Sequence, residues 1–208
     1  MRTRRTTNPT GARTAALRGL LVVLPLLAAA CAPLGPPPPS VSLPPDAVEG
    51  AGDPTRAAII GAAYAFASPA SLAGRPDVAA RAVANYEYLA VEIPTGPRWV
   101  GFSPVAGLEL RRGLPEVRNA VGIAPDAPPQ AVVDALYAAS RALRAGDTEA
   151  ARRILSPPLF PAGGEATLAR LAALPPLPQA NFATSLTAGE LTRQDTEGRR
   201  GGGFGLRF

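Results

Sequence analysis

Few side chains in this sequence could do chemistry, because two of the usual catalytic residue types are missing. The 208 residues include no histidine and no lysine, and all 21 basic residues are arginine. Without histidine, serine–histidine and cysteine–histidine catalysis is excluded and the commonest metal ligand is lost. Without lysine, Schiff-base chemistry is excluded as well. We therefore expect no cofactor and no metal site.

Carboxylates are the chemical groups that remain. Glu87 and Glu92 lie near one end of a predicted helix, and Glu109 and Glu116 lie in the region that follows. A glycosidase needs only two acids that face a cleft, so a cell-wall glycan hydrolase stays open as an alternative. Most of the 16 acidic residues are nevertheless expected on solvated surfaces. We favour a non-enzymatic protein.

A group of aromatic residues is the most concentrated candidate for binding. Tyr86, Tyr88, Trp99 and Phe102 fall within 17 positions, and Arg98 lies among them. Aromatic and arginine side chains are enriched where proteins bind partners, which makes Tyr86, Arg98, Trp99 and Phe102 the candidate binding residues. The alternative is structural: Trp99 and Phe102 could plug one end of a helical bundle.

The first 30 residues have the composition of a secretory signal. They hold five arginines and no acid, and they end in an apolar run of 12 residues, 19–30. A helix of that length rises about 18 Å, whereas the hydrocarbon core of a bilayer is about 30 Å thick. The run is too short to span a membrane but fits the apolar part of a signal peptide, so we predict a signal over 1–30.

The residues after this run resemble the lipobox of bacterial lipoproteins, in which an aliphatic and two small residues precede a cysteine. Residues 27–31 read Leu-Ala-Ala-Ala-Cys, with Ala28 where that family prefers leucine. The resemblance implies cleavage before Cys31, lipid on its sulfur, and anchoring of the protein to the membrane through that lipid. In such lipoproteins an Asp directly after the cysteine favours retention in the inner membrane. Residue 32 is Ala, so the resemblance also implies export to the outer membrane, facing the periplasm. Secretion as a soluble protein and retention of the leader as an anchor are the alternatives.

The charge of the remaining chain argues against nucleic acid as a partner. Five of the 21 arginines lie in the leader, which leaves 16 arginines to match the 16 acidic residues. A nucleic-acid binder needs a clustered basic surface to neutralise phosphates. We expect a membrane contact through Cys31 and an envelope protein or polymer as partner.

Both flanks of the predicted domain differ from it in composition. Residues 31–50 are rich in proline, including the run 36–39, which favours polyproline II and predicts a stiff tether. Residues 195–208 are rich in glycine and arginine and are predicted to form a disordered tail. The arginines and phenylalanines of this tail could contact anionic lipid or polysaccharide, or the tail could simply be solvated.

Residues 51–194 are predicted to form an all-α periplasmic domain, an irregular bundle of five or six short helices broken by prolines. Apolar residues recur at spacings of three and four, and no alternating strand pattern of useful length is present. Helical segments are expected near 54–67, 76–92, 128–145, 147–155, 164–174 and 180–192, with a tight hairpin at Gly146 and a broken helix from 104.

Glycines, prolines and one apolar run give more specific expectations for three of these helices. Residues 57–67 are apolar on every face, which predicts burial all round, and Gly61 is expected to allow close helix packing. The helix that begins at 104 is expected to break near Gly113 and Pro115. Gly122 is expected to stop the helix that precedes it.

Three functions follow from these observations. The leading hypothesis is a membrane-anchored envelope lipoprotein whose helical domain binds a protein or an envelope polymer without catalysis. The second is a carrier of a small ligand, with an apolar cavity between the alanine-rich helices. The third is the carboxylate-dependent hydrolase of cell-wall glycan.

Overall fold

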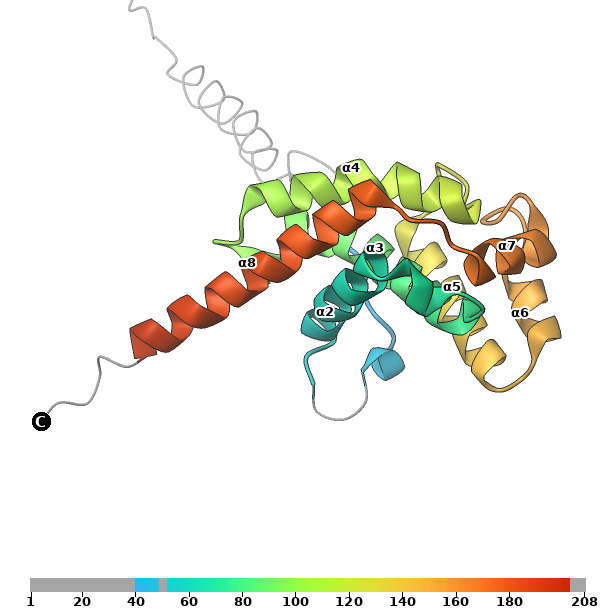
Figure 1. Cartoon of the computed structure of the whole chain (residues 1–208), viewed down its shortest axis with the longest axis horizontal. Coiled ribbons are helices and arrows are strands. Elements are labelled where there is room, and N and C mark those ends of the chain that lie inside the picture. Colours follow the sequence, from blue (N-terminus) through green and yellow to red (C-terminus); the bar gives the residue numbers. More distant parts are fainter. Residues whose placement is uncertain (1–39, 49–51, 203–208) are drawn as a thin grey trace, which may run out of the picture. The chain divides into compact units, whose positions relative to one another are not determined.

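The computed structural model describes residues 40–48 and 52–202, with the backbone alone from 199 to 202 (Figure 1). The predicted signal, Cys31 and most of the predicted tether lie outside these residues. Within them the chain forms α-helices and short 3-10 turns and no strand, which confirms the all-α prediction. The described part contains seven α-helices, α2 to α8, where five or six were expected. None of these helices combines the length and the apolar character needed to cross a membrane.

Helix α2 (Pro54–Ala67) begins at Asp53, whose carboxylate accepts hydrogen bonds from the first free backbone N–H groups. One face of α2 is buried and includes Ile59. The opposite face is not covered: Ile60 is 59% and Tyr64 is 67% exposed. The expectation that this segment is buried on every face is therefore wrong, because no other described element packs over that side.

Helix α3 (Pro76–Thr95) lies at the centre and contacts α2, α4, α5 and α7. Its apolar residues at spacings of three and four, such as Val83, Tyr86 and Leu89, are buried. The helix passes Pro94 and ends at Thr95 instead of near Glu92. Gly107 explains how α4 fits beside this last turn, because a Cβ at Gly107 would lie 2.9 Å from the Cβ of Pro94. Proline is thus accommodated where the neighbouring helix carries no side chain.

Helix α4 (Pro104–Val121) runs through Gly113 and Pro115 without interruption, so the predicted break is wrong. Pro115 faces solvent, where water can satisfy the backbone carbonyl that its ring leaves without an N–H donor. The predicted stop at Gly122 is confirmed. Gly122 has φ 84°, and its N–H and that of Ile123 both donate to the carbonyl of Arg118.

The second half of the chain contributes a hairpin and two further helices. Helices α5 (Pro129–Arg144) and α6 (Thr148–Ile154) form the expected tight turn, with Gly146 at φ 79°. Helix α7 (Gly163–Ala172) follows and contacts α3. Helix α8 (Pro178–Gly202) lies along both α2 and α4 (Figure 1).

The boundary expected at 194/195 lies inside α8, which continues to Gly202. Two ion pairs accompany the continuation: Arg56 of α2 binds Asp195 at 2.5 Å, and Arg193 binds Glu197 one turn later at 2.6 Å. Residues 195–202 are therefore helical, and only residues 203–208 of the predicted tail lie outside the described residues.

Residues 40–48, which the sequence assigns to the tether, lie against the helical domain. The backbone N–H of Ser42 donates to Gln130 of α5 at 2.8 Å, and Asp46 pairs with Arg141 at 3.0 Å. These contacts place residues 40–48 in the same compact unit as the helices. The proline content of this segment predicts an extended tether. It does not reveal that Gln130 and Arg141 of α5 bind residues 40–48.

Candidate functional site

The predicted binding residues Trp99 and Phe102 lie at one end of the core. The 3-10 turn η4 (Pro97–Trp99) follows α3 and carries the indole inward. The two rings meet edge to face at 5.2 Å, and each residue is less than a tenth exposed. The indole Nε1 donates to Glu92 at 3.0 Å. This burial is what the plugging alternative expects, and it leaves little of either ring for a partner.

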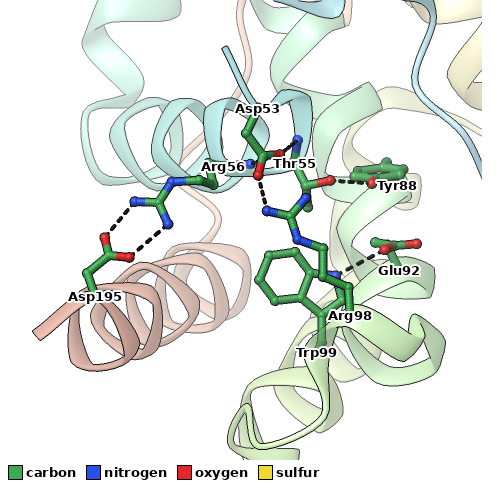
Figure 2. Close-up of polar contacts among 8 residues, drawn as sticks. All are labelled: Asp53, Thr55, Arg56, Tyr88, Glu92, Arg98, Trp99 and Asp195. Atoms are coloured by element: carbon green, nitrogen blue, oxygen red, sulfur yellow. Dashed lines mark hydrogen bonds and ion pairs between the residues drawn. The ribbon is translucent and has the colours of Figure 1, made fainter. Parts of the chain in front are cut away.

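Arg98 remains at the surface but forms an ion pair with Asp53 (Figure 2). Its guanidinium lies over the Trp99 ring and binds the carboxylate of Asp53, at the start of α2. This bond holds the pKa of Asp53 below its ordinary value. Nearby, Arg56 holds Asp195 of α8. The cluster joins α2, η4 and α8, and its charges neutralise one another.

Tyr86 is separated from these residues because it lies wholly inside the domain. It is 0% exposed, packs edge-on against Phe66 at 5.4 Å and donates to the carbonyl of Leu110 at 3.0 Å. Burial raises the pKa of this phenol far above its ordinary value. The four predicted binding residues therefore do not share one surface.

Glu87 forms a buried ion pair with Arg118. Both carboxylate oxygens accept from the guanidinium, at 2.7 and 2.8 Å, and Glu87 is 0% exposed. Burial raises the pKa of Glu87 above its ordinary value, although Arg118 acts in the opposite direction. The same guanidinium donates to the carbonyl of Pro125 at 2.7 Å. The pair ties α3 to α4 and to the loop that follows α4.

The other three candidate carboxylates also have structural partners. Glu92 accepts from the indole described above, and Glu109 accepts from Gln179 at 2.9 Å. Glu116 accepts the backbone N–H of Ala180 at 2.8 Å, in the first turn of α8. Within residues 40–48 and 52–202, no group of three or more His, Cys, Asp or Glu side chains could hold a metal ion.

A pocket lies on another part of the domain, among α2, α3, the 3-10 turn η3 (Pro69–Leu72) and the end of α5. Its volume is about 620 Å³, within the range of small-ligand sites. The lining combines small and apolar side chains with Arg75, Arg81 and Arg144, and Asp77 is the one acid among the lining residues that the structure describes. Exposed Tyr64 also contributes to the lining.

Gly61 explains why α2 leaves this space open. It lies in the middle of the helix and lines the pocket. An ideal Cβ at Gly61 would meet nothing closer than the Nδ2 of Asn85, at 3.8 Å. The expectation that Gly61 serves close helix packing is therefore wrong. A glycine here costs about 1 kcal/mol of helix stability relative to alanine and leaves the space beside it unfilled.

The polar side chains of the pocket present hydrogen-bond donors. Burial raises the pKa of Tyr137 to about 12, so its hydroxyl stays protonated and donates to Asn85 Oδ1 at 2.5 Å. That bond occupies the amide oxygen of Asn85 and leaves its Nδ2 donor on the side of Gly61. Arg81 donates to the carbonyl of Ala47 at 2.8 Å and lies over the Tyr137 ring.

Arg75 and Arg144 complete the polar lining of the pocket. Both residues are exposed, and among the described residues neither guanidinium has an ion pair or hydrogen bond. Two of the three arginines of the pocket are thus available for an external anion.

This pocket is not among the features that the sequence predicts. Its one local signal is Gly61, a glycine in an otherwise apolar helix, which a close packing contact would explain equally well. Comparison with protein-family models, with curated proteins and with solved structures gives no match.

Proposed function

We propose that this protein is a lipid-anchored envelope protein whose helical domain binds a ligand in the α2–α3–α5 pocket without catalysing a reaction. The anchor is lipid on Cys31, at the outer membrane facing the periplasm, as the resemblance to the lipobox implies. The observation that carries the binding function is the pocket of about 620 Å³, in which Arg75 and Arg144 have no ion pair or hydrogen bond among the described residues.

The pocket favours binding over hydrolysis, and it favours a small molecule or the end of a polymer over a protein partner. A concave site of this size suits a small molecule or the end of a polymer better than a flat protein surface. It differs from the enclosed apolar cavity expected of a carrier, because exposed residues such as Tyr64 and Arg144 form part of its wall. The candidate carboxylates have structural partners elsewhere, so the geometry offers nothing specific for a hydrolase.

The test is to identify what the protein carries when it is purified from native membranes. Three forms are compared by mass spectrometry of the released material: the wild type, Gly61→Leu and Gly189→Leu. Leucine at 61 places a side chain in the pocket beside Asn85, whereas Gly189 lies in α8 with nothing within 4 Å of an added Cβ and serves as the matched control. We expect a compound in the wild type and the control that is missing from Gly61→Leu. Identical material in all three forms, or none in any, would overturn the proposal.

A further inference from the structure

We infer that the ligand of this pocket is a small organic anion, a carboxylate or phosphate group joined to an apolar or ring-shaped body. The inference rests on the proposed binding function and names the class of ligand. Its source could be a free molecule of the envelope or the terminal group of an envelope polymer, which share this chemistry.

The charge of the lining favours an anion. Three arginines, Arg75, Arg81 and Arg144, line the pocket together with one acidic residue, Asp77. Among the other described arginines, Arg56, Arg98 and Arg118 are paired with carboxylates. Arg111 and Arg153 have no ion pair among the described residues, but they do not line the pocket. Guanidinium groups bind carboxylate and phosphate with paired hydrogen bonds, which is why this residue type suits such ligands.

Most hydrogen-bonding groups of the pocket are donors, which favours a ligand that carries acceptor atoms. The oxygen of Asn85 is occupied by Tyr137, and its Nδ2 remains as a donor beside Gly61. Ser71 is an exception, because its hydroxyl donates to the carbonyl of Ser68 at 2.7 Å and offers a ligand no donor. Arg81 is held in place by the carbonyl of Ala47 and the ring of Tyr137, so one guanidinium of the pocket is already oriented.

The rest of the lining favours an apolar body on the anion. Helix α2 contributes Ala57, Gly61, Tyr64 and Ala65, and turn η3 contributes Leu72. The exposed ring of Tyr64 provides a flat surface against which an apolar group or ring can pack. Inorganic phosphate would leave most of about 620 Å³ unfilled.

The experiment is calorimetric titration of the purified full-length lipoprotein with four probes. Phenyl phosphate and phenylacetate carry both the anion and the ring, inorganic phosphate carries only the anion, and benzyl alcohol carries only the ring. We expect the first two to bind with dissociation constants below about 1 mM. The other two should bind at least about ten-fold more weakly. Higher salt should weaken the binding of the anions, because it screens partly exposed charges.

Substitutions in the pocket test whether the probes bind there. Arg75→Gln with Arg144→Gln should weaken phenyl phosphate about ten-fold or more, and Gly61→Leu should abolish its binding. The control is Arg111→Gln with Arg153→Gln, which removes the same charge at two exposed arginines that have no ion pair among the described residues. Circular dichroism and thermal unfolding of each variant establish that it is folded.

The outcomes separate the ligand class from the binding function. The proposal that the ligand is an anion would be overturned if benzyl alcohol bound as tightly as the anions. Equal effects of the two pairs of arginine substitutions would overturn it as well. If no probe binds but the native material is still missing from Gly61→Leu, the proposed ligand class is wrong and the binding function stands. If native material is also independent of Gly61, both are wrong. Filtration of the released native material separates a small molecule from a polymer end.

Discussion

At Gly113 the backbone of α4 comes so close to Tyr86 that a Cβ would lie 2.2 Å from the phenol oxygen. Tyr86 cannot move away easily, because it is buried, packs on Phe66 and donates to the carbonyl of Leu110. A single hydroxyl therefore determines which residue α4 can carry at this point. The sequence suggested the opposite role for Gly113, a break in the helix.

Gly113→Ala should lower the free energy of unfolding by about 1–3 kcal/mol, although alanine is the better helix former. Adding Tyr86→Phe removes the oxygen that the new methyl group meets. The double variant should then be less destabilised than the sum of the two single variants, which chemical denaturation can measure. Gly189→Ala is the control, because nothing lies within 4 Å of its added Cβ. Simple additivity would contradict the close approach.

The start of helix α2 depends on two separate functions of Asp53. One carboxylate oxygen accepts the N–H groups of Thr55 and Arg56, and the other binds Arg98. The cap stabilises the helix itself, whereas the ion pair joins it to the turn η4. Two substitutions can separate the contributions, because asparagine keeps an oxygen acceptor and loses the charge.

Asp53→Asn should cost less than about 1 kcal/mol of unfolding free energy, as expected for a partly exposed ion pair. Asp53→Ala should cost about 1 kcal/mol more, because the cap is lost as well. The folded pKa of Asp53 is lowered, so its contribution is present above the unfolded value of about 3.9 and is lost as the pH falls through the folded value. The wild type and Asp53→Asn should therefore converge in acid. A difference that persists at low pH would contradict the ion pair.

The sequence predicted the helices whose ends are marked by local chemistry. Asp53 and the proline after it mark the start of α2, Gly122 stops α4, and Gly146 marks the turn between α5 and α6. It failed where distant contacts decide the outcome. Packing at Gly113 lets α4 continue, and the pairing of Arg56 with Asp195 accompanies the continuation of α8 beyond the predicted boundary.

The pocket belongs to the domain as a whole, and this is why the sequence did not predict it. Ala47, Gly61, Arg81 and Arg144 come from four separate segments, and only the fold brings them together. The predicted aromatic site shows the converse. Trp99 and its neighbours are close in sequence, but the fold turns their rings into the core.

Cys31→Ser tests the proposed lipid anchor. Several acyl chains anchor a protein stably, so the wild type should stay in the membrane fraction until detergent is added. The variant should be found as a larger uncleaved precursor or as protein released from the membrane. Fractionation followed by intact-mass measurement distinguishes these forms. A variant of mature size that remains in the membrane would contradict the anchor.

A structure of the protein purified from native membranes would test the central claim most directly. We predict a bound molecule in the α2–α3–α5 pocket, packed beside Gly61, with its acidic group facing Arg75, Arg81 or Arg144. A pocket closed by the chain's own residues, or one that holds only water in protein whose native ligands were preserved, would contradict the proposed function.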